Sequence, residues 1–380
     1  MKLLILQEKL KEGFRVIERT FLKSLTLPIL NTVLLDVKKN FLNLSTTDLE
    51  ISVRWWGLVK VEKEGGLAVP LSLLSGFFNL LPNKQVVIQK KENTLFIECE
   101  NFKTQIKGIS QEEFPIIPSL PKENFIEIEA IPFCRGLDQV SDIASLSQTR
   151  PEISGIYFSF QKNAVKMVAT DSFRLGEKTI FFENPLSFFG EDNREISFIL
   201  PQKAAKEIIN IFSQKQGMLK IYFSPNQVLL ESQMPETDHP EVQVISRLID
   251  GEYPAYQDII PKKYETQIVL DRNEFLKQVR MASLFSGKIN EVKLKVDPKK
   301  SGVDFFSQNP DLGEHRSFLA GKVKGEPLEV SFNHRFIING IASIEGSEII
   351  LEMNKEEGPA VLRPVGDSSY LYVVMPIKSV

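Results

Sequence analysis

The chain has 380 residues, of which 42% are hydrophobic and 25% are charged, and its formal net charge is −3. This is the composition of an ordinary globular protein. The sequence has no run of 18 apolar residues, so it predicts no membrane-spanning helix. Two cysteines, Cys99 and Cys134, are too few for a disulfide framework. With an N-terminus that lacks a signal-peptide pattern, they predict a protein of the reducing cytoplasm.

The first part of the chain predicts a helix followed by two strands. Four apolar residues recur at helical spacing and form one stripe: Leu10, Phe14, Ile17 and Phe21. From Pro28 the sequence reads P-I-L-N-T-V-L-L-D-V-K-K-N-F-L-N-L-S-T-T-D-L-E. Two alternating apolar runs surround a Lys-Asn turn there, which is typical of a strand pair.

The same pattern occurs twice more along the chain. From Pro151 it reads P-E-I-S-G-I-Y-F-S-F-Q-K-N-A-V-K-M-V-A-T-D-S-F-R, and a looser copy begins at Glu291. The first two copies both end in a Thr-Asp pair, Thr47-Asp48 and Thr170-Asp171. A repeat of this length predicts several copies of one domain.

A second unit follows each strand pair and consists of a short apolar strand, a break and a helix of about three turns. These helices are predicted at residues 71–81, 202–212 and 334–342, and amphipathic stretches at 132–146 and 272–285 precede the second and third copies. Pro70 and Pro201 are expected at the first helical position, which tolerates proline.

Together these patterns predict an α+β fold of three repeated domains, each with two helices packed on antiparallel sheets. The expected domains cover residues 1–122, 123–250 and 251–380, each of ordinary domain size.

Signals of catalysis are weak. The histidines His239, His315 and His334 have no partner at metal-ligand spacing, and no phosphate-binding or nucleophile motif is present. The Thr-Asp pairs leave two alternatives, catalytic carboxylates or turns closed by the Asp side chain. We favour turns because the pair recurs within a repeat, and we expect neither an enzyme nor a cofactor.

Basic residues form stripes on the predicted helices. Each stripe alone is more often a solvated surface, but three stripes on equivalent helices make contact with nucleic-acid phosphates an equal alternative. The stripes are Lys11, Arg15, Arg19 and Lys23; Lys203 and Lys206; and Lys277 and Arg280.

Five motifs in order resemble the bacterial sliding clamps, the β subunits of the replicative DNA polymerase. They are L-T-L-P-I-L at 25–30, T-D-L-E at 47–50, V-A-T-D-S-F-R-L at 168–175, D-G-E-Y-P-A-Y at 250–256 and V-V-M-P-I-K at 373–378. The resemblance implies three clamp-fold domains per chain and a head-to-tail homodimer. The dimer would be a closed six-domain ring with helices inside and sheets outside.

Such a ring would encircle double-stranded DNA, slide along it and act as the processivity factor of the polymerase. The partners implied are the replicative DNA polymerase catalytic subunit, the clamp loader, and other polymerases and repair proteins that carry clamp-binding peptides. The alternative is a clamp-like paralogue or scaffold that is not loaded on DNA.

The resemblance also implies site residues. The peptide-binding pocket would comprise Ile153, Thr170, Ser172, Phe173, Arg174, Leu175, Pro254, Ile259, Val373, Val374, Met375, Pro376 and Ile377. Arg150 would join the stripes that face DNA, and the dimer interface would bring Thr104 and Ile106 against Leu284 and Phe285 of the partner. From the pattern alone, 373–377 has a second interpretation as a final core strand.

The chain departs from the family pattern in three places. Ser172-Phe173 stands where many members have Gly-His or a similar pair, Asp258 replaces an arginine common in the pocket, and Ser24 replaces a basic residue. We expect these changes to affect the peptide preference and the DNA contact near residue 24.

Overall fold

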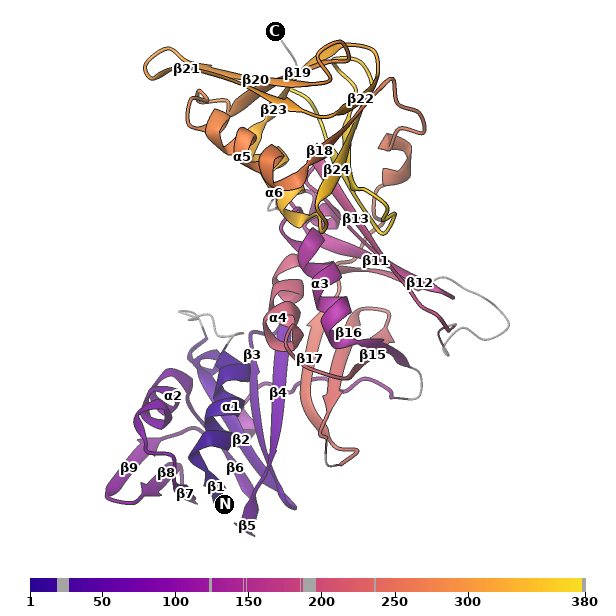
Figure 1. The fold of residues 1–380 in the computed structure, drawn as a ribbon. Coiled ribbons are helices and arrows are strands. Elements are labelled where there is room, and N and C mark those ends of the chain that lie inside the picture. Colours follow the sequence, from indigo (N-terminus) through magenta and orange to yellow (C-terminus); the bar gives the residue numbers. More distant parts are fainter. Residues whose placement is uncertain are drawn as a thin grey trace. The chain divides into compact units, whose positions relative to one another are not determined.

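The structure is a computed structural model that describes residues 1–18, 27–122, 125–145, 147, 149–184, 186, 196–235 and 237–377. It divides into two compact units (Figure 1). The first unit comprises Met1–Cys134, Leu186–Gly190 and Lys203–Leu248, and the second comprises Arg135–Pro185, Glu191–Gln202 and Ile249–Val380. Each unit is described by itself below.

An eight-stranded antiparallel sheet forms the larger layer of the first unit. Its order is β10 (Phe125–Glu129), β15 (Met218–Ser224), β16 (Gln227–Gln233), β17 (Pro240–Arg247), β4 (Ile51–Leu58), β3 (Phe41–Thr47), β2 (Thr32–Lys38) and β6 (Gly65–Pro70). Strand β17 pairs with β4, with Val244 opposite Val53. The sheet therefore continues from the first sequence repeat into the second without an exposed edge between them.

A five-stranded sheet completes the first unit, in the order β5 (Lys60–Lys63), β1 (Lys2–Leu6), β7 (Gln85–Lys91), β8 (Thr94–Cys99) and β9 (Phe102–Lys107). Helices α1 (Gln7–Ile17) and α2 (Leu71–Leu80) pack together, and the Phe14 and Phe78 ring centroids are 5.2 Å apart. The apolar stripe predicted for α1 is confirmed at Leu10 and Ile17, which are buried. Phe21 lies outside the described residues.

The second unit repeats this plan. Its nine-stranded sheet has the order β14 (Ile196–Pro201), β11 (Gly155–Gln161), β12 (Ala164–Thr170), β13 (Arg174–Phe181), β26 (Tyr370–Val374), β25 (Ala360–Pro364), β24 (Glu348–Met353), β18 (Thr266–Asp271) and β22 (Lys322–Gly325). The pairing of β13 with β26 joins the second repeat to the third, with Leu175 opposite Val373.

A four-stranded sheet of the order β21 (Gly313–Ala320), β20 (Gly302–Asn309), β19 (Glu291–Asp297) and β23 (Leu328–Asn333) completes the second unit. Helices α5 (Arg272–Ser283) and α6 (His334–Ser343) lie in this unit, whereas the boundary between the units passes through α3 (Ala130–Ser141) and the start of α4 (Gln202–Phe212). Three short 3-10 turns matter below: η3 (Gln111–Glu113), η4 (Pro151–Ile153) and η5 (Tyr256–Ile259).

All the predicted helices and repeat strand pairs are present in the described residues, but the placement of the two prolines was wrong. Pro70 ends β6 and Pro201 ends β14, so each proline is the last residue of a strand and the helices start at Leu71 and Gln202. Both strands lie at the edge of their sheets, β6 at an end of one and β14 at an end of the other. An edge strand tolerates a residue without a backbone N–H, which explains the position.

Candidate functional site

The two Thr-Asp pairs form the same turn, which confirms the structural interpretation. Asp48 Oδ1 accepts from the Glu50 and Ile51 N–H groups, at 3.0 and 2.6 Å. Asp171 Oδ1 accepts from the Phe173 and Arg174 N–H groups, at 3.0 and 2.9 Å. Both carboxylates are therefore engaged in closing strand-to-strand turns.

The threonine hydroxyls complete these turns. Thr47 Oγ1 accepts from the Leu49 N–H and donates to the Ile51 carbonyl, as Thr170 Oγ1 does with Ser172 and Arg174. The third residue of each turn, Leu49 or Ser172, has a φ of 77°. Glycine takes this left-handed conformation without steric cost, whereas Leu49 and Ser172 each adopt it with a Cβ.

Strand register places three of the expected pocket residues in one row. Thr170 lies opposite Leu175, and Leu175 lies opposite Val373, so the three side chains share one face of the nine-stranded sheet. Val361 extends the row from β25. Leu175 and Val373 are each 1% exposed, so they form the floor of this face rather than its surface.

The segment around η5 covers this floor. Tyr256 and the partly buried Tyr253 pack against the cluster that contains Leu175 and Val373. Tyr253 donates to the Val168 carbonyl at 3.4 Å, and Tyr256 donates to Glu177 at 2.6 Å. Burial and the Glu177 carboxylate raise the pKa of Tyr256, so its hydroxyl remains a donor. Pro254, between the two tyrosines, is thereby held over the strands.

Two exposed apolar side chains lie beside this floor, Ile259 at 47% and Met375 at 36% exposure. Phe173 is 61% exposed, but its ring stacks on Phe336 of α6 with centroids 6.4 Å apart, so it lies on the helix side and the expectation that it lines the pocket was wrong. The Met375 N–H donates to the Phe173 carbonyl at 2.8 Å, and the Ile377 N–H donates to the Ser331 carbonyl at 2.8 Å. The chain after β26 is therefore docked by its backbone, with partly buried Pro376 between the two contacts.

Arg174 and Val374 lie on the opposite face of the sheet. They lie opposite each other on β13 and β26. Gly176, two residues after Arg174, is on the same face, and a Cβ added there would lie 2.4 Å from Ile143 Cδ1, just after α3. Both side chains therefore belong to the helix side. Val374 is fully buried there, which makes Val373 and Val374 core-strand residues on different faces.

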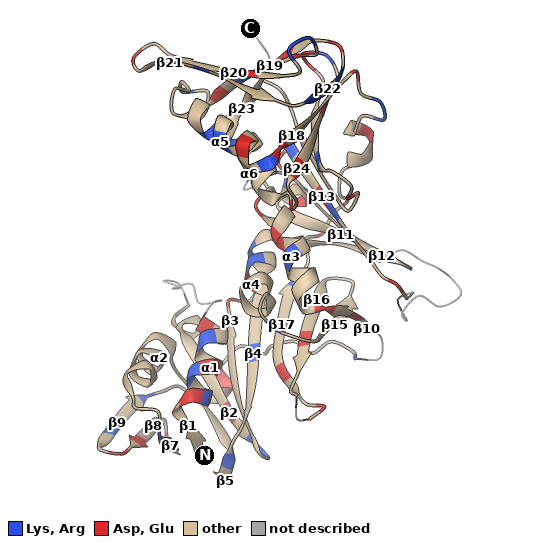
Figure 2. Cartoon of the chain, in the orientation of Figure 1, with Lys and Arg blue, Asp and Glu red and all other residues tan. Residues whose placement is uncertain are grey.

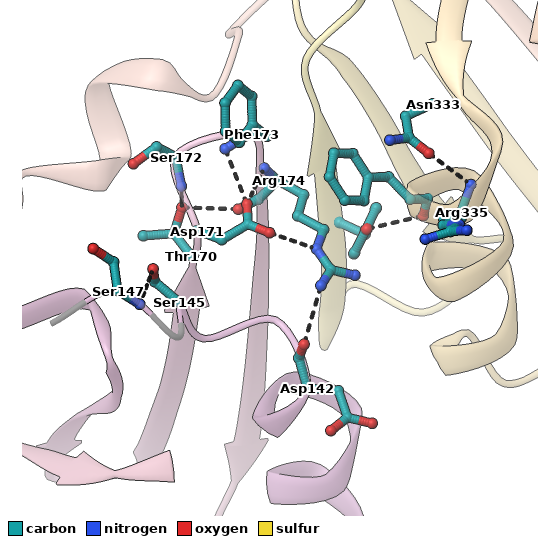
Figure 3. Close-up of polar contacts among 12 residues, drawn as sticks. Asp142, Ser145, Ser147, Thr170, Asp171, Ser172, Phe173, Arg174, Asn333 and Arg335 are labelled. Atoms are coloured by element: carbon teal, nitrogen blue, oxygen red, sulfur yellow. Dashed lines mark hydrogen bonds and ion pairs between the residues drawn. The ribbon is translucent and has the colours of Figure 1, made fainter. Parts of the chain in front are cut away.

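Arg174 connects the second repeat to the third on this side (Figure 3). Its guanidinium donates to Asp171 at 2.9 Å and to the Asp142 carbonyl at 3.1 Å, and it lies 4.8 Å from the centre of the Phe336 ring on α6. Burial lowers the pKa of Arg174, but Tyr372 and Asp171 more than offset this and the net shift is upward. Arg174 therefore joins the second repeat to the third instead of lining the pocket.

Ile153, the last of the expected pocket residues, is buried.

The basic stripes lie on helices, where Lys and Arg are blue in Figure 2. Lys11 and Arg15 are exposed on α1, and Arg280 is exposed on α5. Lys277 forms an ion pair with Glu274 at 3.5 Å, and Arg150 pairs with Glu152 at 3.1 Å.

The remaining basic residues differ in their surroundings. Lys203 forms an ion pair with Asp48, which links α4 to the first repeat within the first unit. Lys206, in the next turn of α4, is exposed. Arg19, Lys23 and Ser24 lie outside the described residues.

The expected interface residues lie at or beside two strands, β9 and β21, that end their sheets in the described part of the chain. Thr104 and Ile106 belong to β9, the last strand of the five-stranded sheet. Ile106 is 4% exposed and faces Leu95, so β9 would offer its backbone rather than this side chain. Leu284 is 71% exposed just after α5, and the Phe285 ring stacks on His315 of the edge strand β21, 5.8 Å away.

Sequence reasoning missed Tyr253 and Tyr256, which cover the groove, and Val361, which extends its floor. The Y-P-A-Y letters were visible, but only the register shows which strands they cover.

No helix in the described residues is long and apolar enough to cross a membrane.

Comparisons with known proteins agree over the whole chain. It matches the N-terminal, central and C-terminal domains of the DNA polymerase III beta subunit family over residues 1–118, 127–255 and 257–378. A beta sliding clamp of Synechococcus elongatus is 26% identical, with 100% of this chain and 99% of the relative covered. One of Staphylococcus aureus is 26% identical, with 93% of each covered.

Solved structures show the same fold. The DNA polymerase sliding clamp of Bacillus subtilis has a TM-score of 0.93 at 24% identity, and the DNA polymerase III beta subunit of Thermotoga maritima has a TM-score of 0.89 at 24% identity. In both cases 100% of each chain is covered.

Proposed function

The chain belongs to the DNA polymerase III beta subunit family, and from this premise we propose that two copies form a ring that encircles double-stranded DNA. As a beta sliding clamp it is the processivity subunit of DNA polymerase III in DNA replication, a non-catalytic accessory subunit of α+β fold with three clamp domains. The ring, its contacts and the residues that make them are what we propose. We place the protein in the bacterial cytoplasm.

The observation that carries the proposal is that both inter-repeat junctions within the chain are continuous sheets, whereas β9 and β21 end their sheets at open edges. An open edge with unpaired backbone groups invites another strand. Pairing β9 of one copy with β21 of the other would repeat the same junction between subunits. A head-to-tail contact of this kind gives a closed ring when the rotation closes.

Exposed apolar side chains near β21 support this contact. Besides Leu284, Met281 is 41% exposed and Ile289 is 61% exposed, and Phe102 at the start of β9 is 48% exposed. These residues would be covered in the dimer.

We propose domain borders at 122/123 and 250/251.

The basic helices would face DNA inside the ring. A tether should hold DNA by topology, because each neutralised phosphate adds affinity and slows sliding. The partly paired stripes, with Lys203 bound to Asp48 and Lys277 to Glu274, suit weak contact of this kind. Lys11, Arg15, Lys206, Arg280 and Arg150 would complete the contact.

The face formed by Thr170, Leu175, Val373, Pro254, Ile259 and Met375 would take clamp-binding peptides. The replicative polymerase catalytic subunit, the clamp loader, other polymerases and repair proteins would compete for it. Met375 suits an adaptable apolar site, and the exposed Asp258 would disfavour an acidic peptide end.

Loading the protein onto nicked circular DNA with a clamp loader tests this function. We expect a mass of two chains in light scattering, retention on the circle through gel filtration at moderate salt, and release when a restriction enzyme linearises the circle. A dimer that the loader never places on circular DNA would instead favour the clamp-like paralogue.

A further inference from the structure

The first unit contains a cavity of about 630 Å³ on the face of the eight-stranded sheet that lies opposite α1. Arg54 and Trp56 of β4 line it, together with Phe41 of β3. The intervening Trp55 points to the other face, where its ring would meet a Cβ added to Gly13 of α1. The segment after η3 forms one wall of the cavity through Ile116 and Ile117.

Comparison of the two repeats explains why the cavity exists. The Phe-Pro pair at 114–115 corresponds to the Tyr-Pro pair at 253–254, so Ile117 takes the place of Tyr256. Within the strand pairs, which begin at Pro28 and Pro151, Leu34 takes the place of Tyr157. In the second unit, Tyr256 packs into the apolar cluster and Tyr157 stacks on Tyr253, with centroids 5.1 Å apart. Two smaller aliphatic residues leave the corresponding space of the first unit open.

The charge on this face is reversed as well. Arg54 occupies the strand position that Glu177 holds in the second repeat, seven residues after the threonine of the turn. Glu177 accepts from the Tyr256 hydroxyl at 2.6 Å. Arg54 donates to the Ile117 carbonyl at 3.1 Å and forms no ion pair within the described residues. Burial lowers its pKa, as expected for a cation that lacks a compensating anion.

The surroundings add two further cations and an aromatic wall. Lys38 and Lys39 line the cavity, and its one carboxylate, Asp36, is bound by Lys38 at 2.8 Å, so the lining carries three cations against one anion. The His239 ring stacks on Phe41 with centroids 3.9 Å apart. Ile116, at the rim, is 95% exposed.

We propose that this cavity binds an acidic peptide, with an aromatic side chain in the space that Tyr256 fills in the second unit and a neighbouring carboxylate on Arg54. A carboxylate can accept two parallel hydrogen bonds from a guanidinium, and Ile116 would cover the aromatic ring. The exposed isoleucine favours a peptide over a nucleic acid, whose phosphates gain nothing from an apolar wall. The site is separate from the second-unit groove and does not rest on the proposed function.

Tryptophan fluorescence measures this binding directly, because Trp56 lines the cavity and Trp55 is 3% exposed on the other face. The probe is the peptide acetyl-Asp-Glu-Phe-Glu-Asp amide, with its neutral counterpart acetyl-Asn-Gln-Phe-Gln-Asn amide as the control ligand. We expect a saturable change with the acidic peptide, and at least tenfold weaker binding for the neutral one. Affinity should fall as salt rises, since charge pairs at a partly exposed site are screened.

Three variants locate the site. Arg54→Met should weaken binding at least tenfold, since charge-assisted hydrogen bonds are lost. Ile117→Tyr should fill the cavity and also abolish binding, and Ile116→Ser, at an exposed position, should weaken it severalfold without risk to the fold. Arg316→Met removes a matched arginine that lies 4.9 Å from the Phe306 ring in the second unit, and it should bind as the wild type does.

No saturable change up to millimolar peptide would overturn the proposal, as would unchanged affinity in Ile117→Tyr and Ile116→Ser. Tighter binding of hexathymidylate than of the acidic peptide would overturn it in favour of single-stranded nucleic acid. A Met375→Ala variant, altered only in the second-unit groove, should leave the affinity unchanged. Loss of binding in that variant would place the peptide in the groove and overturn the proposal.

Discussion

At the scale of single residues, the two Thr-Asp turns show backbone strain at corresponding positions. Leu49 and Ser172 have the same φ of 77°, a conformation that costs an L-residue about 1–2 kcal/mol. Leu49 is 45% exposed, so its side chain contributes little packing to offset this cost. The strain belongs to the turn itself, because the Asp and Thr side chains fix its hydrogen bonds.

Leu49→Gly should therefore raise the free energy of unfolding by up to about 1 kcal/mol, the strain relieved less the added entropy of the unfolded chain. Urea denaturation followed by circular dichroism measures it. Leu58→Gly is the matched control, because Leu58 is 47% exposed within β4, and it should lower stability. Equal losses in both variants would show that the turn at Leu49 is not strained.

A second residue-scale prediction concerns Tyr222. Burial, followed by the Glu231 carboxylate, raises the pKa of its hydroxyl to about 12. In the unfolded chain the group ionises near pH 10. Its neutral form therefore favours the folded state below pH 10, and this contribution is lost as the pH rises towards 12.

The free energy of unfolding of the wild type should fall between pH 8 and pH 11, and that of Tyr222→Phe should fall by about 1.4 kcal/mol less. This energy corresponds to one pH unit above the pKa of tyrosine in the unfolded chain. Urea midpoints at the two pH values give the difference. The comparison between the two proteins cancels the other tyrosines. An identical pH dependence would mean that Tyr222 ionises normally in the folded protein.

At the scale of helices and strands, sequence periodicity predicted the elements well, because the pattern that buries one face is local. The α1 stripe at Leu10 and Ile17 and the boundaries of α4 at 202–212 needed no knowledge of distant residues. The pairing of β13 with β26 could not be derived in this way, since its strands are nearly two hundred residues apart. The same register decides that Arg174 faces α6 and that Leu175 faces the groove.

The C-terminal strand provides a test of that register. Val374 is fully buried and pairs with Arg174 and Ala360, whereas Met375 is 36% exposed. A chain ending at Met375 should keep its melting transition nearly unchanged and bind a clamp-binding peptide more weakly, because Pro376 and Ile377 are lost. A chain ending at Val373 should lose about 2 kcal/mol or more, the cost of exposing a core valine and leaving strand partners unpaired.

Calorimetry and peptide titration on the two truncated chains separate these effects. If the chain ending at Met375 binds the peptide as the wild type does, the tail lies outside the groove. If it melts as early as the chain ending at Val373, residues 376–377 are part of the core instead.

The open edges of β9 and β21 lead to another element-scale prediction. Leu284→Asp should convert the dimer to monomer at micromolar concentration, because a buried carboxylate without a partner is costly at an interface. Phe285 is a poorer choice, since it is half-buried and stacks on His315 within the chain. Phe181→Asp, at a position 65% exposed at the end of β13, is the control and should remain dimeric.

Light scattering with a concentration series gives the outcome. A fully dimeric Leu284→Asp protein would place the interface away from the end of α5. A dimer that survives Leu284→Asp and is lost in Phe181→Asp would move the interface to the nine-stranded sheet.

At the scale of the whole molecule, the family and the three-domain repeat were predictable from sequence, because five motifs in order carry them. The cavity beside Arg54 was not. It exists because the segment at 114–117 crosses the sheet with Ile117 at the position where the second repeat has the larger Tyr256. Only after both strand pairs and both crossing segments have been placed does the missing tyrosine become visible.

The last prediction concerns how the whole protein holds DNA. Lys11 and Arg15 are exposed on one face of α1 and serve no buried contact, whereas Lys203 is committed to Asp48. Reversing Lys11 and Arg15 to Glu should therefore shorten retention on circular DNA severalfold at low salt while leaving dimer mass and melting unchanged. The effect should shrink as salt rises, because phosphate contacts act through counterion release.

Lys60→Glu with Lys63→Glu is the matched control, a charge reversal of the same size on the exposed edge strand β5 of the same unit. It should leave retention on the circle unchanged. Gel filtration of loaded circles at two salt concentrations measures both variants. If the α1 variant is retained as long as the wild type at low salt, Lys11 and Arg15 do not face the DNA. If both variants lose retention equally, net charge rather than the position of the α1 stripe governs the contact.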